Sequence, residues 1–140
     1  MTAKKTKEYL DGSAREILRL LRLKNSRAEI VVLKDGEMNA LRAKLKELVD
    51  FKGREAKKIV REKQVSVLSF PEPKGFPHPE NGKKMMGEVY LNKDFARGRR
   101  DVILRLLIHG ILHLAGYEHE GKRDTIRMEK REKEIFKKIF

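Results

Sequence analysis

Three of the four histidines of the chain lie within eleven positions, in the stretch LLIHGILHLAGYEHEG over residues 106–121. His109 and His113 are four residues apart, so on a helix their side chains lie one above the other on the same face. Gly116 is of the residue type at which helices commonly end, and His119 follows three residues later, where a returning chain can bring it back to the pair. The spacing predicts imidazole nitrogens that converge on one ion.

Imidazole nitrogen is a common ligand of Zn²⁺, and three histidine ligands leave one of the four tetrahedral positions open for water. This arrangement is typical of catalytic zinc, whereas a structural site needs a fourth protein ligand and the chain has no cysteine to supply one. The alternative is a polar stripe that faces a loop, but it would leave two unpaired imidazoles on a buried helix, which costs free energy. We therefore expect one Zn²⁺ ion bound by His109, His113 and His119.

The same histidine and glycine spacing occurs in a class of zinc peptidases, whose motif is H-E-x-x-H-x-x-G-x-x-H. The Glu next to the first His is their general base, and the corresponding residue here is Gly110, which has no side chain. Peptide hydrolysis by that route is therefore not expected. We expect position 110 to lie beside the ion, where the missing side chain leaves room for a phosphate group.

The helix that carries the histidines must be largely buried, because residues 102–115 are apolar at every position except 105, 109, 110 and 113. Asp101, Arg105, His109 and His113 form one narrow polar stripe along it, since residues four apart lie about 40° apart on a helix. The other elements are predicted from capping signals and apolar periodicity. They are a helix that begins with a capping box at residues 13–16 and runs to about residue 23, a strand at 28–34, a helix at 35–49 with Asp35 as its cap, strands at 65–70 and 86–92, a long surface loop with all four prolines at 71–84, and a charged helix from 122 to the end.

The chain carries 34 Lys and Arg against 21 Asp and Glu, which gives a net charge of +13. Such a surplus favours polyanions such as nucleic acid, or anionic membrane surfaces, although a merely well-dissolved basic protein would have the same composition. Basic segments at residues 52–63 and 93–100 could hold phosphates. The lack of cysteine, and of any apolar run long enough for a signal or for the roughly 20 residues that span a bilayer, predicts a soluble cytoplasmic protein without membrane contact.

Three segments carry a family resemblance. HGILHLAGYEHEG resembles the H-G-x-L-H-L-x-G-Y-D-H signature of the YbeY family, the bacterial single-strand-specific metallo-endoribonucleases. VSVLSFPEP resembles the T-[DN]-V-L-S-F-P strand of that family, and MGEVYLN resembles its L-G-D-[IV] strand, in the matching order. The resemblance spans roughly residues 38–128. It departs from the family pattern at Glu118 and Glu88, where Asp is usual, and at Val65 and Ser66, which replace Thr-[DN].

The resemblance implies an α+β, zincin-like fold, in which a small mixed sheet packs with helices and the metal-binding helix lies near the C-terminus. It implies that residues 1–140, a length that suits one domain, form a single metal-dependent hydrolase domain. The implied activity is zinc-dependent cleavage of single-stranded RNA in ribosomal RNA maturation, notably at the 3′ end of the small-subunit RNA, and in ribosome quality control. Ribosomal RNA and ribosomal subunit proteins would be the partners.

The resemblance also suggests two catalytic residues. The family has an arginine upstream of its first matching strand, for which Arg61 is the nearest candidate and Arg54 the second. An arginine there could stabilise the charged transition state of a phosphodiester. Glu118 could orient an imidazole or move a proton, but it could equally be a surface carboxylate beside the helix.

Two other functions stay open from the sequence. The chain could be a non-catalytic RNA- or ribosome-binding factor whose zinc is structural. Alternatively, it could be a zinc hydrolase of another substrate class, including one that cleaves peptides with an unconventional base. For the ribonuclease, we expect Gly110→Glu to keep the metal and reduce RNA cleavage, because a carboxylate beside an anionic phosphodiester adds repulsion.

Overall fold

The computed structural model describes residues 2–47, 64–72, 84–118 and 121–140. The elements in these ranges are α1 (Ala3–Leu20), β1 (Ser26–Leu33), α2 (Asp35–Glu47), β2 (Val67–Pro71), β3 (Lys84–Asn92), α4 (Lys93–Ala96), α5 (Arg100–Leu114) and α6 (Lys122–Ile139). The basic segment 52–63 with both candidate arginines, most of the proline-rich loop, and His119 lie outside the described residues.

The strands form one mixed sheet in the order β1-β3-β2. β1 runs parallel to β3, with Ile30 opposite Val89, and β2 runs antiparallel to β3, with Leu68 opposite Tyr90. The three predicted strands are therefore confirmed, and every boundary agrees to within two residues. The expected α+β class with a small mixed sheet is also confirmed.

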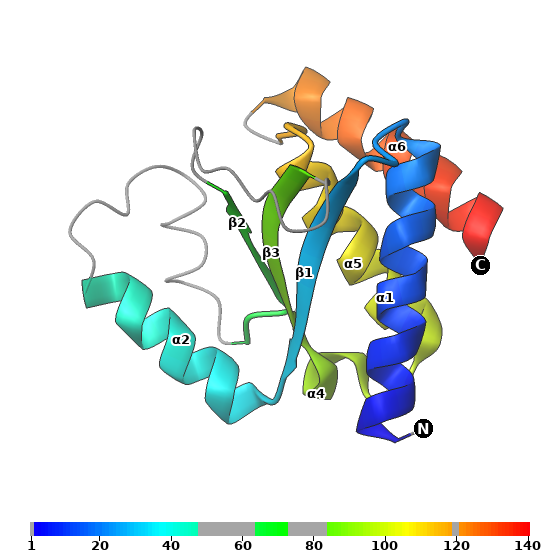
Figure 1. Ribbon diagram of the computed structural model, residues 1–140. Coiled ribbons are helices and arrows are strands. Elements are labelled where there is room, and N and C mark those ends of the chain that lie inside the picture. The colour runs from blue at the N-terminus through cyan, green and yellow to red at the C-terminus, as the bar shows by residue number, and fades with distance from the viewer. Residues whose placement is uncertain (1, 48–63, 73–83, 119–120) are drawn as a thin grey trace.

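Helices cover both faces of this sheet. Figure 1 shows α1 and α5 on one side and α2 on the other. α6 runs along α5, since Glu132 contacts His109 and the Phe136 ring lies against Arg105. Because successive strand residues point to opposite faces, Val89 packs with α1, α5 and α6, whereas Tyr90 packs with Met38 and Leu41 of α2. The larger of the two cores is the one that surrounds α5.

The apolar residues of α5 are buried, as their pattern predicts. The apolar side chains on the buried face of α5 have almost no contact with solvent, because the sheet, α1 and α6 enclose the helix on most sides. Their exposed fractions are zero at Leu104, Leu107, Ile108, Ile111 and Leu112. The two histidines of the helix are half-buried, so this part of the polar stripe lies at the edge of the core, where solvent can reach it.

α1 begins at Ala3, ten residues before the predicted start, so the capping-box interpretation of residues 13–16 is wrong. The actual cap is Thr2, whose hydroxyl oxygen accepts a hydrogen bond from the Lys5 amide at 3.2 Å. The helix continues through the supposed start because its buried face already begins upstream. That face consists of Leu10, Ala14, Ile17 and Leu18, at helical spacing.

The one-turn helix α4 follows β3 directly and was not predicted. Asn92 is fully buried and caps this helix, since its side-chain oxygen accepts hydrogen bonds from the amides of Asp94 at 3.0 Å and Phe95 at 3.2 Å. Its side-chain nitrogen donates to the Val65 carbonyl at 2.9 Å and to the carboxylate of Asp35. Asp35 is the first residue of α2, so this network joins α2, α4 and the strand ends.

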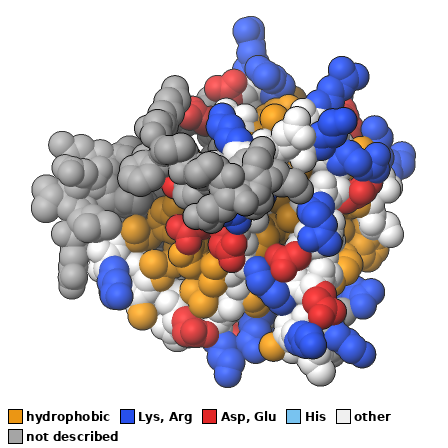
Figure 2. Space-filling view, viewed as in Figure 1, with side chains coloured by type: hydrophobic (Ala, Val, Ile, Leu, Met, Phe, Trp, Pro, Cys, Tyr) orange, Lys and Arg blue, Asp and Glu red, His pale blue; other side chains and the backbone are white. Residues whose placement is uncertain are grey.

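On the face shown in Figure 2, the described Lys and Arg side chains are scattered over the upper, right and lower parts with acidic side chains among them, and apolar side chains show near the centre. Within the described parts of the chain, no helix is both long enough and apolar enough to cross a membrane. The net charge of +13 is therefore not gathered into one patch on this face.

Candidate metal centre

α5 ends one residue beyond His113, in the way the glycine predicts. Gly116 adopts φ +99°, a left-handed conformation that favours glycine. Its amide donates to the His113 carbonyl at 3.1 Å, and the Tyr117 amide donates to the Leu112 carbonyl at 2.9 Å. These two bonds are those of a Schellman motif, which ends a helix and turns the chain away from its axis. The predicted helix break is thus confirmed.

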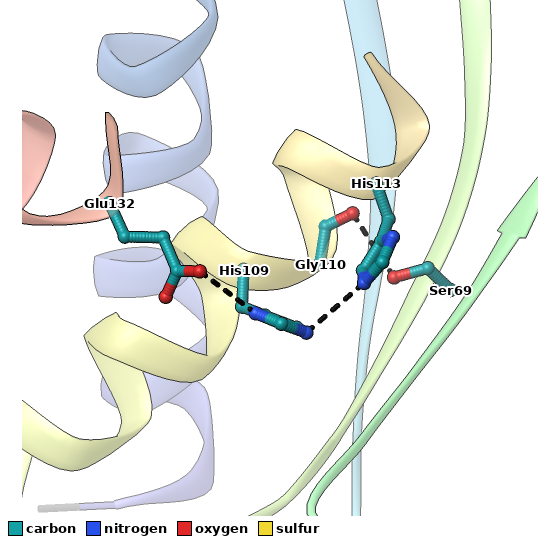
Figure 3. A network of polar contacts seen from close by, with 5 residues as sticks. All are labelled: Ser69, His109, Gly110, His113 and Glu132. Atoms are coloured by element: carbon teal, nitrogen blue, oxygen red, sulfur yellow. Dashed lines mark hydrogen bonds and ion pairs between the residues drawn. The ribbon is translucent and has the colours of Figure 1, made fainter. Parts of the chain in front are cut away.

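The two described histidines of the motif converge. The Nε2 atoms of His109 and His113 lie 3.1 Å apart, and their rings meet edge to face with centroids 4.6 Å apart. Both side chains are half-buried, and 29% of the His109 side chain is exposed. Figure 3 shows the two rings pointing toward one another from successive turns of α5. The spacing of four residues therefore brings the two rings together on one face of α5, as expected from the sequence.

This separation fits two ligands of one zinc ion. Zinc lies about 2.0–2.1 Å from imidazole nitrogen, so two nitrogens in a tetrahedral site are about 3.3–3.4 Å apart. The observed 3.1 Å is close to that value. Among the residues with a described placement, no group of three or more His, Cys, Asp or Glu residues could hold a metal ion. The predicted third ligand, His119, lies outside them, so the complete ligand set stays a prediction.

A carboxylate from α6 contacts the other side of His109. The Nδ1 atom of His109 lies 3.1 Å from Oε1 of Glu132, and 27% of the Glu132 side chain is exposed. Figure 3 shows His109 between Glu132 and His113. An ionised carboxylate only accepts hydrogen bonds, so Nδ1 is the nitrogen that can donate to Glu132. In a neutral imidazole with its proton on Nδ1, the Nε2 atom that faces His113 carries a lone pair.

Glu132 was missed at the level of the sequence, although a signal for it exists. Met128 and Ile135 are buried, and Glu132 shares their face of α6, four residues after the first and three before the second. A carboxylate on the buried face of an amphipathic helix needs a partner. The sequence does not say which residue of another helix lies opposite.

Gly110 faces the sheet and not the ion, so the expectation for this position is wrong. A Cβ atom on Gly110 would lie 2.5 Å from Cγ1 of Val89 and 3.0 Å from Oγ of Ser69. The Ser69 hydroxyl donates to the Gly110 carbonyl at 3.1 Å, which fixes β2 against α5. The missing side chain makes room for the sheet, and a glutamate here would disrupt that contact before it could act on a substrate.

Glu118 is exposed beyond the end of α5. With Gly116, Tyr117 and Asp124 it lines a shallow pocket of about 230 Å³ between α5 and α6. The guanidinium of Arg127 lies over the Tyr117 ring at 5.9 Å on the same side. A catalytic role of Glu118 stays a prediction, as does that of Arg61, which is not among the described residues.

The basic segment 93–100 lies at the opposite end of α5 from His113. Arg100 is the first residue of the helix and His113 is thirteen residues later, which is about 20 Å along the axis. Cations of this segment line a cavity of about 950 Å³ between α1, β1 and α4, together with Lys7 and Lys34. The two described histidines of the motif and the basic segment are therefore separate parts of the surface.

Partners within the chain hold two of these cations. Arg99 forms an ion pair with Asp101 at 2.7 Å, and this hydrogen-bonded ion pair lowers the pKa of the Asp101 carboxyl. Arg100 lies over the Tyr9 ring, with 5.0 Å between the guanidinium carbon and the ring centroid. The guanidinium groups nevertheless remain exposed and could contact a phosphate.

Comparison with known proteins places the chain in a family. The family model described as Endoribonuclease YbeY matches residues 3–140. A protein of that name from Sulfurihydrogenibium sp. is 30% identical over 131 residues, with 88% of this chain and 76% of that protein covered. One from Persephonella marina is 28% identical over 143 residues, with 96% and 84% covered.

Other relatives match over a shorter stretch. An Endoribonuclease YbeY from Neorickettsia sennetsu is 36% identical over 87 residues, and the match covers 56% of this chain and 58% of that protein. The chain thus spans little more than half the length of this relative. The match of the family model over nearly every residue, and the likeness to the Sulfurihydrogenibium protein over most of both chains, show that this chain belongs to the YbeY endoribonuclease family.

Proposed function

We propose that this chain is a zinc-dependent endoribonuclease that cleaves single-stranded RNA. In this proposal it acts in the cytoplasm on ribosomal RNA, at the 3′ end of the small-subunit RNA, and in ribosome quality control, with ribosomal subunit proteins as further partners. The observation that carries the proposal is the approach of the His109 and His113 Nε2 atoms to 3.1 Å on a buried helix. Family membership supports it, because the relatives are named as endoribonucleases.

In the proposed site, residues 1–140 act as one hydrolase domain of zincin-like type and α5 is its metal-binding helix. His109, His113 and His119 would hold the ion. A bound zinc ion supplies a Lewis acid and brings the pKa of water near neutrality, which suits attack on a phosphodiester. Of the other candidates, Arg61 would stabilise the negative charge of the phosphate, and Glu118 would orient an imidazole or carry a proton.

The basic segment 93–100 has a different role in this proposal. Residues 106–121 contain no Lys or Arg, so the chain itself provides no cationic side chain within the motif. Lys93, Arg97, Arg99 and Arg100 are exposed, and Arg100, the first residue of α5, lies about 20 Å along the helix axis from His113. These cations would bind phosphates of an RNA strand away from the cleaved bond, so they contribute to affinity and not to the bond-breaking step.

The experiment compares three proteins on two substrates: metal-free protein, zinc-loaded protein and zinc-loaded His113→Ala, on single-stranded RNA and on a peptide. We expect only the zinc-loaded parent to cleave RNA and none of the three to cleave the peptide. RNA binding without cleavage by zinc-loaded protein would instead identify a binding factor with structural zinc. Cleavage of the peptide alone would identify a hydrolase of another class.

A further inference from the structure

We infer that Glu132 is a positioning residue for the metal centre, which it serves by holding His109 in the tautomer and orientation that present Nε2 to the ion. The inference rests on the proposed zinc site. Its basis is the contact between Glu132 Oε1 and His109 Nδ1 at 3.1 Å, on the side of the ring opposite to His113.

The first consequence of this contact concerns the proton of the imidazole. A neutral imidazole carries one N–H, and the nitrogen without it is the one that binds metal. Because Glu132 accepts a hydrogen bond from Nδ1–H, the lone pair is placed on Nε2, 3.1 Å from Nε2 of His113. Without Glu132, His109 would also populate the tautomer with its proton on Nε2, and that tautomer cannot bind the ion through this nitrogen.

The second consequence concerns the orientation and basicity of the ring. A hydrogen bond at Nδ1 restrains rotation of the imidazole about its bond to Cβ, and a carboxylate acceptor raises the electron density on the ligand nitrogen. The His109 ring stands at 78° to that of His113, and their Nε2 atoms are 3.1 Å apart, close to the separation of two nitrogens bound to one zinc ion. Outer partners of this kind typically change metal affinity by about 10- to 100-fold.

The packing of α6 fixes Glu132 in this place. Along the antiparallel helices, Glu132 contacts His109 and, one turn farther, the Phe136 ring lies 3.9 Å from the guanidinium of Arg105. Arg131 donates to the Leu20 carbonyl of α1 at 3.1 Å, which secures the helix on its other side. The other described acids of α6, namely Asp124, Glu129 and Glu134, are exposed, whereas Glu132 is half-buried.

One test reads the tautomer without metal. Long-range ¹⁵N–¹H NMR spectra of metal-free protein would be recorded for the parent, Glu132→Gln and Glu132→Ala, at a pH about two units above the ordinary histidine value of about 6.5. We expect the Nδ1–H form of His109 in the parent and in Glu132→Gln, because the amide oxygen still accepts. In Glu132→Ala we expect a shift toward the Nε2–H form. A parent with the proton on Nε2 would overturn the inference.

A second test reads zinc affinity by competition with a chromophoric chelator. We expect Glu132→Ala to bind zinc about 10- to 100-fold more weakly than the parent, and Glu132→Gln to lie between them. Glu129→Ala removes an exposed carboxylate from the same helix and should bind zinc like the parent. Circular dichroism would verify that the variants fold. If Glu132→Ala does not fold, the near-isosteric Glu132→Gln still provides the test.

The outcomes separate the inference from the proposed function. If the parent binds zinc and both Glu132 variants bind it equally well, the positioning role is wrong and the zinc site stands. If the parent binds no zinc, the proposed function fails and the positioning role fails with it.

Discussion

The two ends of α5 are built on different principles. Around its C-terminal half, residues 106–121 carry no Lys or Arg, and specific contacts hold this part of the helix, among them those from Glu132 to His109 and from Ser69 to Gly110. Around its N-terminal end, segment 93–100 carries four exposed cations, two of which also interact with other side chains. The C-terminal end therefore has a pair of imidazoles at fixed positions, whereas the N-terminal end has several cationic side chains of similar kind.

This difference indicates what each end can do. Binding one ion requires nitrogens placed to a fraction of an ångström, so removal of a single interaction should have a large effect. Attraction of a polyanion depends on the number of nearby charges, so each cation should contribute little alone. Substitutions at the two ends should therefore differ in the size of their effect.

The largest effect is expected for His113→Ala, which removes one of the two proposed ligands that the structure describes. We expect zinc affinity to fall by more than the roughly 100-fold that loss of an outer partner causes, because a direct bond to the ion is lost. Asp101→Asn, at the far end of the same stripe of α5, is the matched control and should retain zinc. Isothermal titration calorimetry measures both. If His113→Ala and the parent bind zinc with equal affinity, the metal centre does not lie at the C-terminal end of α5.

The next effect is on folding. Gly110→Ala places a methyl group 2.5 Å from the Val89 side chain, and we expect it to lower the free energy of unfolding by about 1–3 kcal/mol, as overpacking commonly does. Gly36→Ala is the control, since no heavy atom lies within 4 Å of a Cβ there. Chemical denaturation measures the change. In a Val89→Ala background the penalty of Gly110→Ala should shrink, and an unchanged penalty would contradict the contact.

A smaller effect per residue is expected at the basic end. Replacing Arg97 and Arg100 with Gln should reduce the salt dependence of affinity for single-stranded RNA, by about 0.7 in the logarithmic slope for each phosphate that the protein no longer neutralises. Lys137→Gln with Lys138→Gln removes the same charge from the exposed end of α6 and should leave the slope unchanged. Fluorescence anisotropy at several salt concentrations gives these slopes. If both pairs change the slope equally, total charge and not segment 93–100 governs binding.

The smallest effect, on the melting temperature, is expected for Asp35. Its carboxylate accepts a hydrogen bond from Asn92, the residue that caps α4 next to the basic segment 93–100. Hydrogen bonds, first from Asn92 and then from Gln64, lower the pKa of the Asp35 carboxyl. A lowered pKa stabilises the fold above the unfolded-state value of about 3.9, and this contribution is lost as pH falls through the folded-state value. We expect Asp35→Asn to lower the melting temperature slightly at pH 7, with the difference from the parent vanishing in acid. A difference that persists in acid would show that the charge is not responsible.

Local patterns were enough to predict most elements of the fold. The apolar run of α5, the short β-branched run of β1 and the glycine at the end of α5 each depend on neighbouring residues, and each prediction is confirmed. The start of α1 was missed because a capping signal at residues 13–16 also fits a helix interior when Thr2 caps farther upstream. Sequence signals for a helix start are local, but the buried face decides whether the helix continues.

The candidate site was only partly predictable for a related reason. His109 and His113 belong to one helix, so their separation follows from its geometry. Glu132 reaches His109 from a different helix, 23 residues later, and its position depends on how α6 packs against α5. Gly110 was misassigned because the sequence does not specify which face of α5 meets β3. The residues that were missed or misplaced are therefore those whose role depends on contacts between different elements.

Metal analysis of freshly purified protein tests the central claim most directly. Elemental analysis would give the zinc content per chain, followed by titration of chelator-treated protein with added zinc and the same measurements on His113→Ala. We predict one zinc ion per chain in the parent, recovery of that ion after chelation, and its loss in His113→Ala. Parent protein that contains no metal and takes up no added zinc would contradict the account.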